Sequence, residues 1–226
     1  MKVKLINTTP NPEENLIYIA RVSSNKSDDD KKKNIEKLIK YLIDNKHWSP
    51  FEHSFMTVEI ETSRAIAHQI IRHRSMFFQE FSLRYSEAPG YEKIEFRKQA
   101  KKNRQSSEEV YNPDMKFFLQ DGLFVSGKAT DIWDYLLSMI DTFYKELLKE
   151  GVSRETARFV LPLVTKTKLY VTGNLRSWIH FLQIRDDEHA QKEIRLIAKE
   201  IKKLFIENFP ITSKSLNWYE NRDKTI

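Results

Sequence analysis

Five stretches of this 226-residue sequence repeat their apolar residues at the spacing of an α-helix. No other feature of the sequence restricts the possible folds as strongly. In the last of them, Ile194, Ile197, Ile201 and Phe205 fall on one stripe. Shorter segments at 2–6, 54–62 and 165–173 alternate apolar and polar residues, as strands do. The sequence therefore predicts an α/β (α+β) fold, with a small, mostly antiparallel sheet flanked by long helices. The helical stretches are residues 27–47, 63–74, 131–151, 174–185 and 188–209.

The chain length favours a single domain, 1–226. A chain of 226 residues can bury one sizeable core and is short for two ordinary domains. Residues 89–127 are the least regular part, with Pro, Gly and a basic run. We expect a long, partly irregular loop there, with short helical pieces, and a loop of this length is typically functional or mobile.

The composition excludes several classes of function. There is no cysteine, so disulfides, thiolate metal sites and cysteine nucleophiles are excluded. The histidines are scattered, and we predict no metal site. No apolar run is long enough to span a bilayer and the N-terminus lacks a signal-peptide core, so we predict a cytoplasmic protein that does not bind membranes.

The stretch RHRSMFFQEFSLRYS, residues 72–86, combines cations with phenylalanines, which neither a packed core nor a solvated face requires. In the helix predicted over 63–74, one face is apolar and the opposite face carries His68, Gln69, Arg72 and His73. Helix geometry would return Arg74 to the apolar face. Either the helix stops before this residue, or Arg74 is buried against a ligand or a carboxylate.

Arginines gather in three segments, 69–86, 154–162 and 174–189, which suits a ligand with several phosphates. The alternative is that they are surface arginines with ordinary glutamate partners. A lone histidine is more often a satisfied polar residue than a ligand. The residues alone therefore predict an anionic, nucleotide-like ligand and leave the catalytic class open.

Several motifs, in the right order, resemble the flavin-dependent thymidylate synthases. RHR, followed by Ser82 and then Arg84-Tyr85-Ser86, resembles the signature of that family. Five further segments resemble it over most of the chain, and they read HWSPFEH (47–53), FRKQAKKNRQSS (96–107), ARFVLP (157–162), NLRSWIHFLQIR (174–185) and HAQKEIR (189–195).

The resemblance implies the family's α/β fold and a methyltransferase that makes dTMP from dUMP. Methylenetetrahydrofolate would supply the carbon, NADPH the reducing equivalents, and bound FAD would carry the hydride. It further implies a homotetramer with shared active sites. Such an enzyme needs no cysteine nucleophile, which agrees with the composition.

The resemblance also implies roles for individual residues. Arg185 would polarise the uracil as the catalytic group and also bind dUMP. FAD would be bound by Ser49, Arg72, His73, Arg74, Glu80, Asn174, Arg176 and His180, with His47 close by. The nucleotide dUMP would be bound by Gln69, Arg72, Glu80, Ser82, Leu83, Arg84 and Arg158, the last from a neighbouring subunit.

Two positions depart from the family motif. Phe77 stands where the family commonly has Ser, and Gln79 where it has Asn. Phe77 would add an apolar wall to the flavin pocket. Two other functions stay open: another nucleotide-binding flavoprotein with a different reaction, and a nucleic-acid-binding module. The net charge of +6 and the basic runs favour the latter, whereas the family resemblance predicts no nucleic-acid partner.

Overall fold

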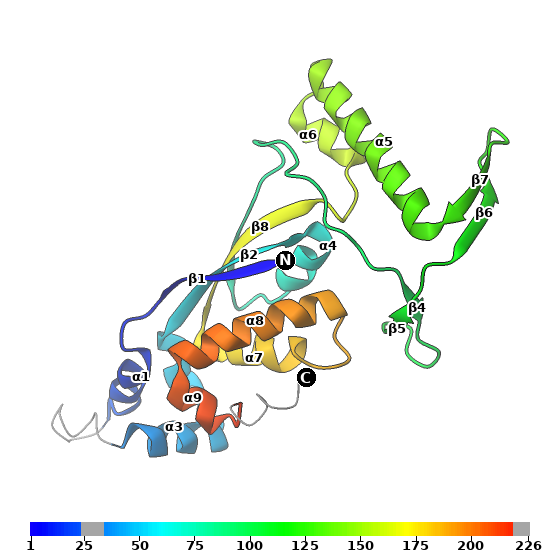
Figure 1. Cartoon of the computed structure of the whole chain (residues 1–226). Helices are drawn as coiled ribbons and strands as arrows, with labels where there is room; N and C mark the ends of the chain where they lie inside the picture. Colours follow the sequence, from blue (N-terminus) through cyan, green and yellow to red (C-terminus); the bar gives the residue numbers. More distant parts are fainter. Residues whose placement is uncertain (24–33, 219–226) are drawn as a thin grey trace. The chain divides into compact units, whose positions relative to one another are not determined.

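The computed structural model describes residues 1–23 and 34–218 and divides the chain into two compact units (Figure 1). The Asp run and the KKK at the start of the helix predicted over 27–47 lie outside the described residues. The single domain predicted from the chain length stays a prediction. Of the described residues, the first unit comprises 1–23, 34–61, 68–80 and 168–218, and the second comprises 62–67 and 81–167.

A four-stranded sheet forms the centre of the first unit, in the order β1-β2-β8-β3. The pairs β1–β2 and β3–β8 are antiparallel, which confirms the predicted mixed fold with a small, mostly antiparallel sheet. The short strand β3, within the RHR stretch, was not predicted. The strands are β1 (Lys2–Thr8), β2 (Phe55–Ser63), β3 (Phe77–Glu80) and β8 (Lys166–Asn174).

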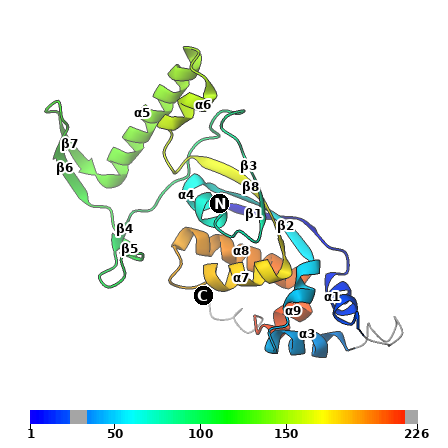
Figure 2. The ribbon, with the colours of Figure 1, turned by 180° about the vertical axis from the view of Figure 1, so that it is seen from behind.

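Two helices cover one face of this sheet, α7 (Leu175–Arg185) and α8 (Lys192–Asn208), as both views show (Figures 1 and 2). The alternation in β2 turns Met56, Val58 and Ile60 toward the core, where they are fully buried. Trp178 of α7 is also fully buried, and its indole N–H donates to the carbonyl of Met56 at 2.9 Å. Leu175, Ile179 and Leu182 are buried as well, and the helix predicted over 174–185 is confirmed.

Helix α4 (Arg64–Ile70) ends earlier than the sequence predicted. A turn follows it, in which the backbone N–H of His73 donates to the carbonyl of Ile70 at 3.2 Å. The RHR stretch therefore lies beyond the helix rather than at its end, and Arg74 is exposed. The first of the two alternatives for Arg74 is therefore correct, since the helix stops before this residue. Arg74 is not buried and needs no buried partner.

Gly173, near the end of β8, lies where two other segments approach the strand closely. A methyl group at this position would lie 3.1 Å from Cγ of Met76 and 3.2 Å from Nε1 of Trp178, closer than nearly all such contacts in proteins. Met76 is buried and follows the turn that contains His73. The glycine therefore allows this turn and the start of α7 to pack against the same strand.

Three shorter helices complete the first unit, and a buried carboxylate joins two of them. Glu13 of α1 accepts hydrogen bonds from the backbone N–H groups of Ile211, at 3.2 Å, and Thr212, at 2.5 Å. These groups belong to the first turn of α9, where backbone N–H groups have no partner within the helix. The helices are α1 (Pro12–Ala20), α3 (Ile35–Asp44) and α9 (Pro210–Ser215), and a short turn of 3-10 helix, η1, covers Ser49–His53.

The buried Glu13 predicts a pH dependence of stability. Burial raises the pKa of Glu13 above its ordinary value of 4.5, although the hydrogen bonds from Thr212 and Ile211 oppose this. The folded protein therefore holds this proton more tightly than the unfolded chain. The contribution of Glu13 is fully present below about pH 4.5 and is lost as the pH rises through the folded pKa.

We expect Glu13→Gln to remove this part of the fall in stability with rising pH, since glutamine does not titrate. The measurement is thermal unfolding of both proteins across that pH range, at one protein concentration. Glu14→Gln, one residue along on the exposed side of α1, is the matched control. An unchanged pH slope in Glu13→Gln would contradict the assignment.

The second unit contains two hairpins, a long helix and two short helical segments. Residues 89–127, all of which the structure describes, contain four short strands and no helix, so the short helical pieces expected there were wrong. The helix α5 (Ala129–Lys149) ends before Gly151, as predicted, and Gly151 has a φ of +84°. A short helix follows, α6 (Arg154–Ala157), and it is continued by the 3-10 helix η2 (Arg158–Val160). The hairpins are β4 (Arg97–Gln99) with β5 (Ser107–Val110), and β6 (Asp114–Phe118) with β7 (Phe124–Lys128).

Helix α5 presents an apolar face that the described part of the chain does not cover. Tyr135, Met139 and Phe143 are spaced four residues apart and therefore share a face, and they are 67%, 53% and 55% exposed. Leu136 lies beside them and is also exposed. In the whole of this 21-residue helix only Tyr144 is buried. A second apolar surface is therefore expected to cover this face.

Candidate active site

The guanidinium of Arg185 is held by two neutral acceptors in the first unit. Arg185 is the last residue of α7 and is partly buried. Its Nε–H donates to Nε2 of His73 at 3.2 Å, and its Nη2 donates to the backbone carbonyl of Gln69 at 3.3 Å. The side-chain amide of Gln69 in turn donates to Oε1 of Gln191 at 2.6 Å. The structure thus brings His73, which the resemblance assigned to FAD, together with Gln69 and Arg185, which it assigned to dUMP.

Both side chains of the Arg185–His73 pair have shifted pKa values. Burial is the largest cause of the fall in the pKa of His73 to about 4, and the charges of Arg185 and His180 add to it. Burial also lowers the pKa of Arg185, yet an arginine remains protonated in proteins. At neutral pH this pair is therefore a neutral imidazole beside a guanidinium cation.

The residues assigned to FAD at the start of α7 lie beside η1. Asn174 precedes the helix, and its Oδ1 accepts a hydrogen bond from the backbone N–H of Ser177 at 2.9 Å. This N-cap hydrogen bond uses Oδ1 of Asn174, so its side-chain NH2 group is available to donate to a ligand. Arg176 pairs with Glu52 of η1, the element that begins with Ser49. Glu52 was missed, although it lies within the HWSPFEH motif.

The remaining FAD-assigned residues are exposed or partly exposed cations and histidines. Within the described residues, Arg72 and Arg74 make no hydrogen bond or ion pair, and both are exposed. His180 is exposed, and its ring lies 6.2 Å from that of His73. His47 is exposed and contacts the ring of Tyr41 edge-on.

The two positions that depart from the family motif lie on β3, which pairs with β8. Phe77 is opposite Thr172 and Gln79 is opposite Tyr170. Phe77 is 69% exposed and is therefore not part of the core formed by the described residues. Glu80, at the end of the strand, is partly exposed. That Phe77 adds a wall to the flavin pocket stays a prediction.

The second unit gathers two of the arginines assigned to dUMP around one glutamate. Arg84 pairs with the carboxylate of Glu155 at 3.5 Å, and Nε of Arg158 donates to the backbone carbonyl of Glu155 at 3.3 Å. The hydroxyl of Ser82 accepts from the backbone N–H of Arg84 at 3.3 Å, while Leu83 is buried. Glu155 was not predicted, although it precedes the ARFVLP motif by only two residues.

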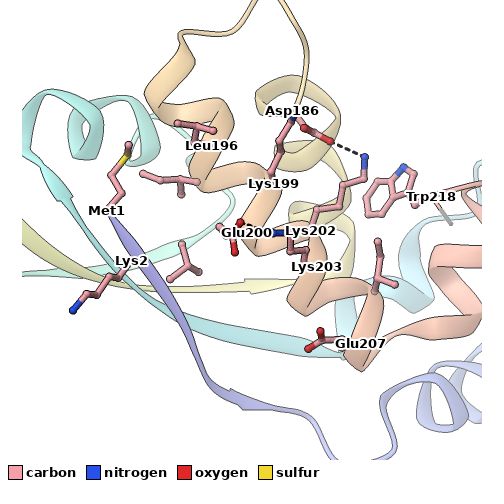
Figure 3. Close-up of a pocket in the computed structure, with 13 residues that line it drawn as sticks. Met1, Lys2, Asp186, Leu196, Lys199, Glu200, Lys202, Lys203, Glu207 and Trp218 are labelled. Carbon is pink, nitrogen blue, oxygen red and sulfur yellow. Dashed lines mark hydrogen bonds and ion pairs between the residues drawn. The ribbon is translucent and has the colours of Figure 1, made fainter. Parts of the chain in front are cut away.

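A wide groove in the first unit lies apart from all these residues. It has a volume of about 1030 Å³ and runs between α8 and the start of β1 (Figure 3). Two ion pairs lie in its lining, Lys202 with Asp186 at 2.7 Å and Lys203 with Glu200 at 2.6 Å, and Lys202 also lies 5.0 Å from the ring of Trp218. None of the residues assigned to FAD or dUMP lines it.

Comparison with known proteins decides the family. Residues 4–211 match the family model described as thymidylate synthase complementing protein. The chain is 44% identical over 207 residues to a flavin-dependent thymidylate synthase of Synechocystis sp., with 92% of this chain and 90% of the relative covered. The chain belongs to the flavin-dependent thymidylate synthase family.

Further members of the flavin-dependent thymidylate synthase family are similar over most of their length. One from Thermosipho africanus is 37% identical over 198 residues, covering 87% of this chain and 82% of the relative. Among solved structures, a UMP/dUMP methylase from Streptomyces cacaoi bound with 5-Br dUMP has a TM-score of 0.73 at 26% identity. It covers 96% of this chain and is itself covered over 94%.

The described residues contain neither a candidate membrane-spanning helix nor a candidate metal site. None of the helices in residues 1–23 and 34–218 is long and apolar enough to cross a membrane. Over the same ranges, no group of three or more His, Asp or Glu side chains is arranged to hold a metal ion.

Proposed function

We propose that this chain catalyses the reductive methylation of dUMP to dTMP. Methylenetetrahydrofolate would donate the carbon, NADPH the reducing equivalents, and FAD would be the bound cofactor. The observation that carries this proposal is the half-buried guanidinium of Arg185, fixed by His73 and Gln69, in a member of the flavin-dependent thymidylate synthase family. We further propose a cytoplasmic location for it.

The residues present fit a flavin dinucleotide by the chemistry of their donors. Arg72 and Arg74 offer exposed guanidiniums that no described residue uses. Guanidiniums bind phosphate oxygens in pairs, so these two suit a diphosphate. Asn174, Ser49 and His180 add further polar side chains near the start of α7 and on its outer face. When bound, FAD supplies the hydride-transfer chemistry that no side chain can provide.

The chain's own residues would bind dUMP and stabilise charge on it. Arg84 and Arg158 are suited to its phosphate, and Arg185 to the negative charge that develops on the uracil. A fixed guanidinium in a site with little water stabilises such charge far better than water does, because it need not reorient. A uracil with more negative charge is a better nucleophile toward the methylene carbon.

The balance of electrons fixes the by-products of this reaction. The methylene carbon must gain two electrons to become a methyl group, and NADPH supplies them. The folate therefore leaves as tetrahydrofolate, and the hydrogen on C5 of dUMP leaves as a proton. No cysteine adduct is needed, in agreement with a sequence that has no cysteine.

The deciding experiment measures tritium release from dUMP labelled at C5. We expect yellow protein whose chromophore is FAD, bleaching by NADPH, and tritium release and dTMP formation when both dUMP and methylenetetrahydrofolate are present. A flavin reduced by NADPH without dUMP-dependent release would favour another flavoprotein. Colourless protein with salt-sensitive binding to DNA or RNA would favour a nucleic-acid-binding module.

We also propose that the chain assembles as a homotetramer with shared active sites. The apolar face of α5, formed by Tyr135, Leu136, Met139 and Phe143, supports self-association, since it is exposed within the described chain. Obligate interfaces between copies of one chain are typically apolar. The contribution of Arg158 to dUMP from a neighbouring subunit belongs to the same proposal.

Glu155 should weaken the binding of dUMP, because it pairs with the guanidinium that the phosphate needs. Arg84 and Glu155 are 55% and 60% exposed, so their ion pair is easily displaced. We expect Glu155→Gln to tighten the binding of dUMP by up to about fivefold, the most that an exposed pair contributes. Titration calorimetry with dUMP would measure this.

The matched control for Glu155→Gln is Glu87→Gln. Glu87 forms a similar exposed pair with Arg154 at 3.3 Å, and neither residue is assigned to a ligand. This control should leave the binding of dUMP unchanged. Weaker binding in Glu155→Gln would show that Glu155 supports Arg84 instead of competing for it.

A further inference from the structure

The two hydrogen-bond partners of the partly buried Arg185 are both uncharged. None of the ion pairs between described residues includes Arg185, and the adjacent Asp186 is engaged by Lys202 at 2.7 Å. A carboxylate partner would neutralise the guanidinium and compete with an anionic substrate. Neutral acceptors fix the orientation of the guanidinium and leave its charge available.

His73 is fixed in turn by its surroundings. Its ring packs edge-on against Phe181 of α7, with centroids 4.8 Å apart, and Phe181 is fully buried. The other titratable groups around it are Arg185 and His180, both on α7, and both disfavour a proton on the ring. Since burial and these charges lower the pKa of His73 to about 4, the ring is neutral at neutral pH.

The hydrogen bond also determines which ring nitrogen carries the proton. A guanidinium only donates hydrogen bonds, so Nε2 of His73 must accept with its lone pair. The single proton of the neutral ring is therefore on Nδ1. This leaves Nδ1–H as the only N–H donor of the side chain.

We propose that His73 is a positioning residue for Arg185: its Nε2 accepts from Nε–H and holds the guanidinium in the orientation needed to stabilise charge on the substrate. The carbonyl of Gln69 is the second acceptor, and Gln191 holds the side-chain amide of Gln69. This role is additional to any contact that His73 makes with the cofactor. Its catalytic meaning rests on the proposed function, but the geometry does not.

Three substitutions separate this role from simple packing. Gln places an oxygen acceptor close to the position of Nε2. Asn is too short to reach Arg185, and Phe keeps the packing against Phe181 but accepts nothing. At saturating FAD we expect His73→Phe and His73→Asn to lower kcat by about ten- to hundredfold, the loss of a hydrogen bond to a charged group. His73→Gln should retain most of kcat, and the KM for dUMP should change little in all three.

The coupling between the two residues gives a second readout. In the Arg185→Ala background, His73→Phe should cause little further loss of kcat, since nothing remains to be positioned. His68→Phe is the matched control, because His68 is an exposed histidine of α4 outside the assigned sites. It should leave kcat unchanged. Additive losses from His73→Phe and Arg185→Ala would overturn the proposal.

Nitrogen NMR of the flavin-free protein tests the geometry without any turnover. With 15N-labelled histidine, we expect the His73 ring to show a protonated Nδ1 and a bare Nε2, and no titration near ~6.5, where free histidine titrates. In Arg185→Ala the signal of Nε2 should shift as it loses its donor. A proton on Nε2, or an unchanged signal in Arg185→Ala, would overturn the proposal.

Failure of the proposed function and failure of the positioning role of His73 give different experimental results. Absence of dUMP-dependent tritium release would contradict the proposed function and leave the NMR result valid. Conversely, full activity in His73→Phe would contradict the positioning role and leave the proposed function intact.

Discussion

Arg185→Ala should lower kcat by about 10²- to 10³-fold, the loss found when one preorganised group that stabilises transition-state charge is removed. Flavin content and the circular dichroism spectrum should stay close to those of the unmodified protein, because Arg185 lies at the end of α7 and its guanidinium makes two hydrogen bonds to described residues. The measurement is tritium release from C5-labelled dUMP under saturating conditions, together with the absorbance of bound flavin.

Two further variants show whether the loss of kcat in Arg185→Ala is specific to the guanidinium of this residue. Arg185→Lys keeps the charge but lacks the planar fork, so it cannot make both hydrogen bonds and should recover only part of the activity. Arg154→Ala removes an exposed arginine that pairs with Glu87 and should behave as the unmodified protein. Activity near the unmodified level in Arg185→Ala would refute the proposed role of this residue.

Substitution of the α5 face should have the second large effect. In Met139→Asp combined with Phe143→Asp, two buried carboxylates would have to lie in an apolar interface, which is costly without partners. We expect the mass in solution to fall from four copies of the 27.0-kDa chain to a smaller species. Activity should fall with it if the sites are shared. Light scattering coupled to gel filtration measures the mass.

The control for this face is Lys145→Gln, which changes a charge on another side of α5. It should leave the assembly unchanged. A complementation test then addresses the shared sites: chains with Arg158→Ala mixed and reassembled with chains carrying Arg185→Ala should regain roughly a quarter of the sites if each site uses both subunits. A monomer that binds FAD tightly and is fully active would contradict shared sites.

The parts of the fold with strong local periodicity were predictable from the sequence. Helix α7 turns Leu175, Trp178, Ile179 and Leu182 inward, as their spacing predicts, and these residues are buried. The hairpins within 89–127 were not predictable in this way. All four residues of β5 are exposed, so no alternation of apolar and polar residues marks the strand.

The candidate site, too, was predictable from the sequence only in part. Their spacing of four residues places Arg176 and His180 on one face of α7, whereas only the resemblance to a family supplied their roles. The contact between His73 and Arg185 joins residues 112 positions apart, and no local pattern indicates it. The end of α4 was predicted too late because the apolar spacing continues to Ile71, whereas the chain turns after Ile70.

Gly173 is a residue whose importance a list of ligand contacts would not reveal. No role in binding is assigned to it, yet a single added methyl group would push against Met76 and Trp178. Met76 follows the turn that carries His73, and Trp178 belongs to the helix that ends in Arg185. Tolerance to mutation in this enzyme should therefore be set partly by steric room behind the reactive groups, because alanine at position 173 requires Met76 or Trp178 to shift by a few tenths of an ångström.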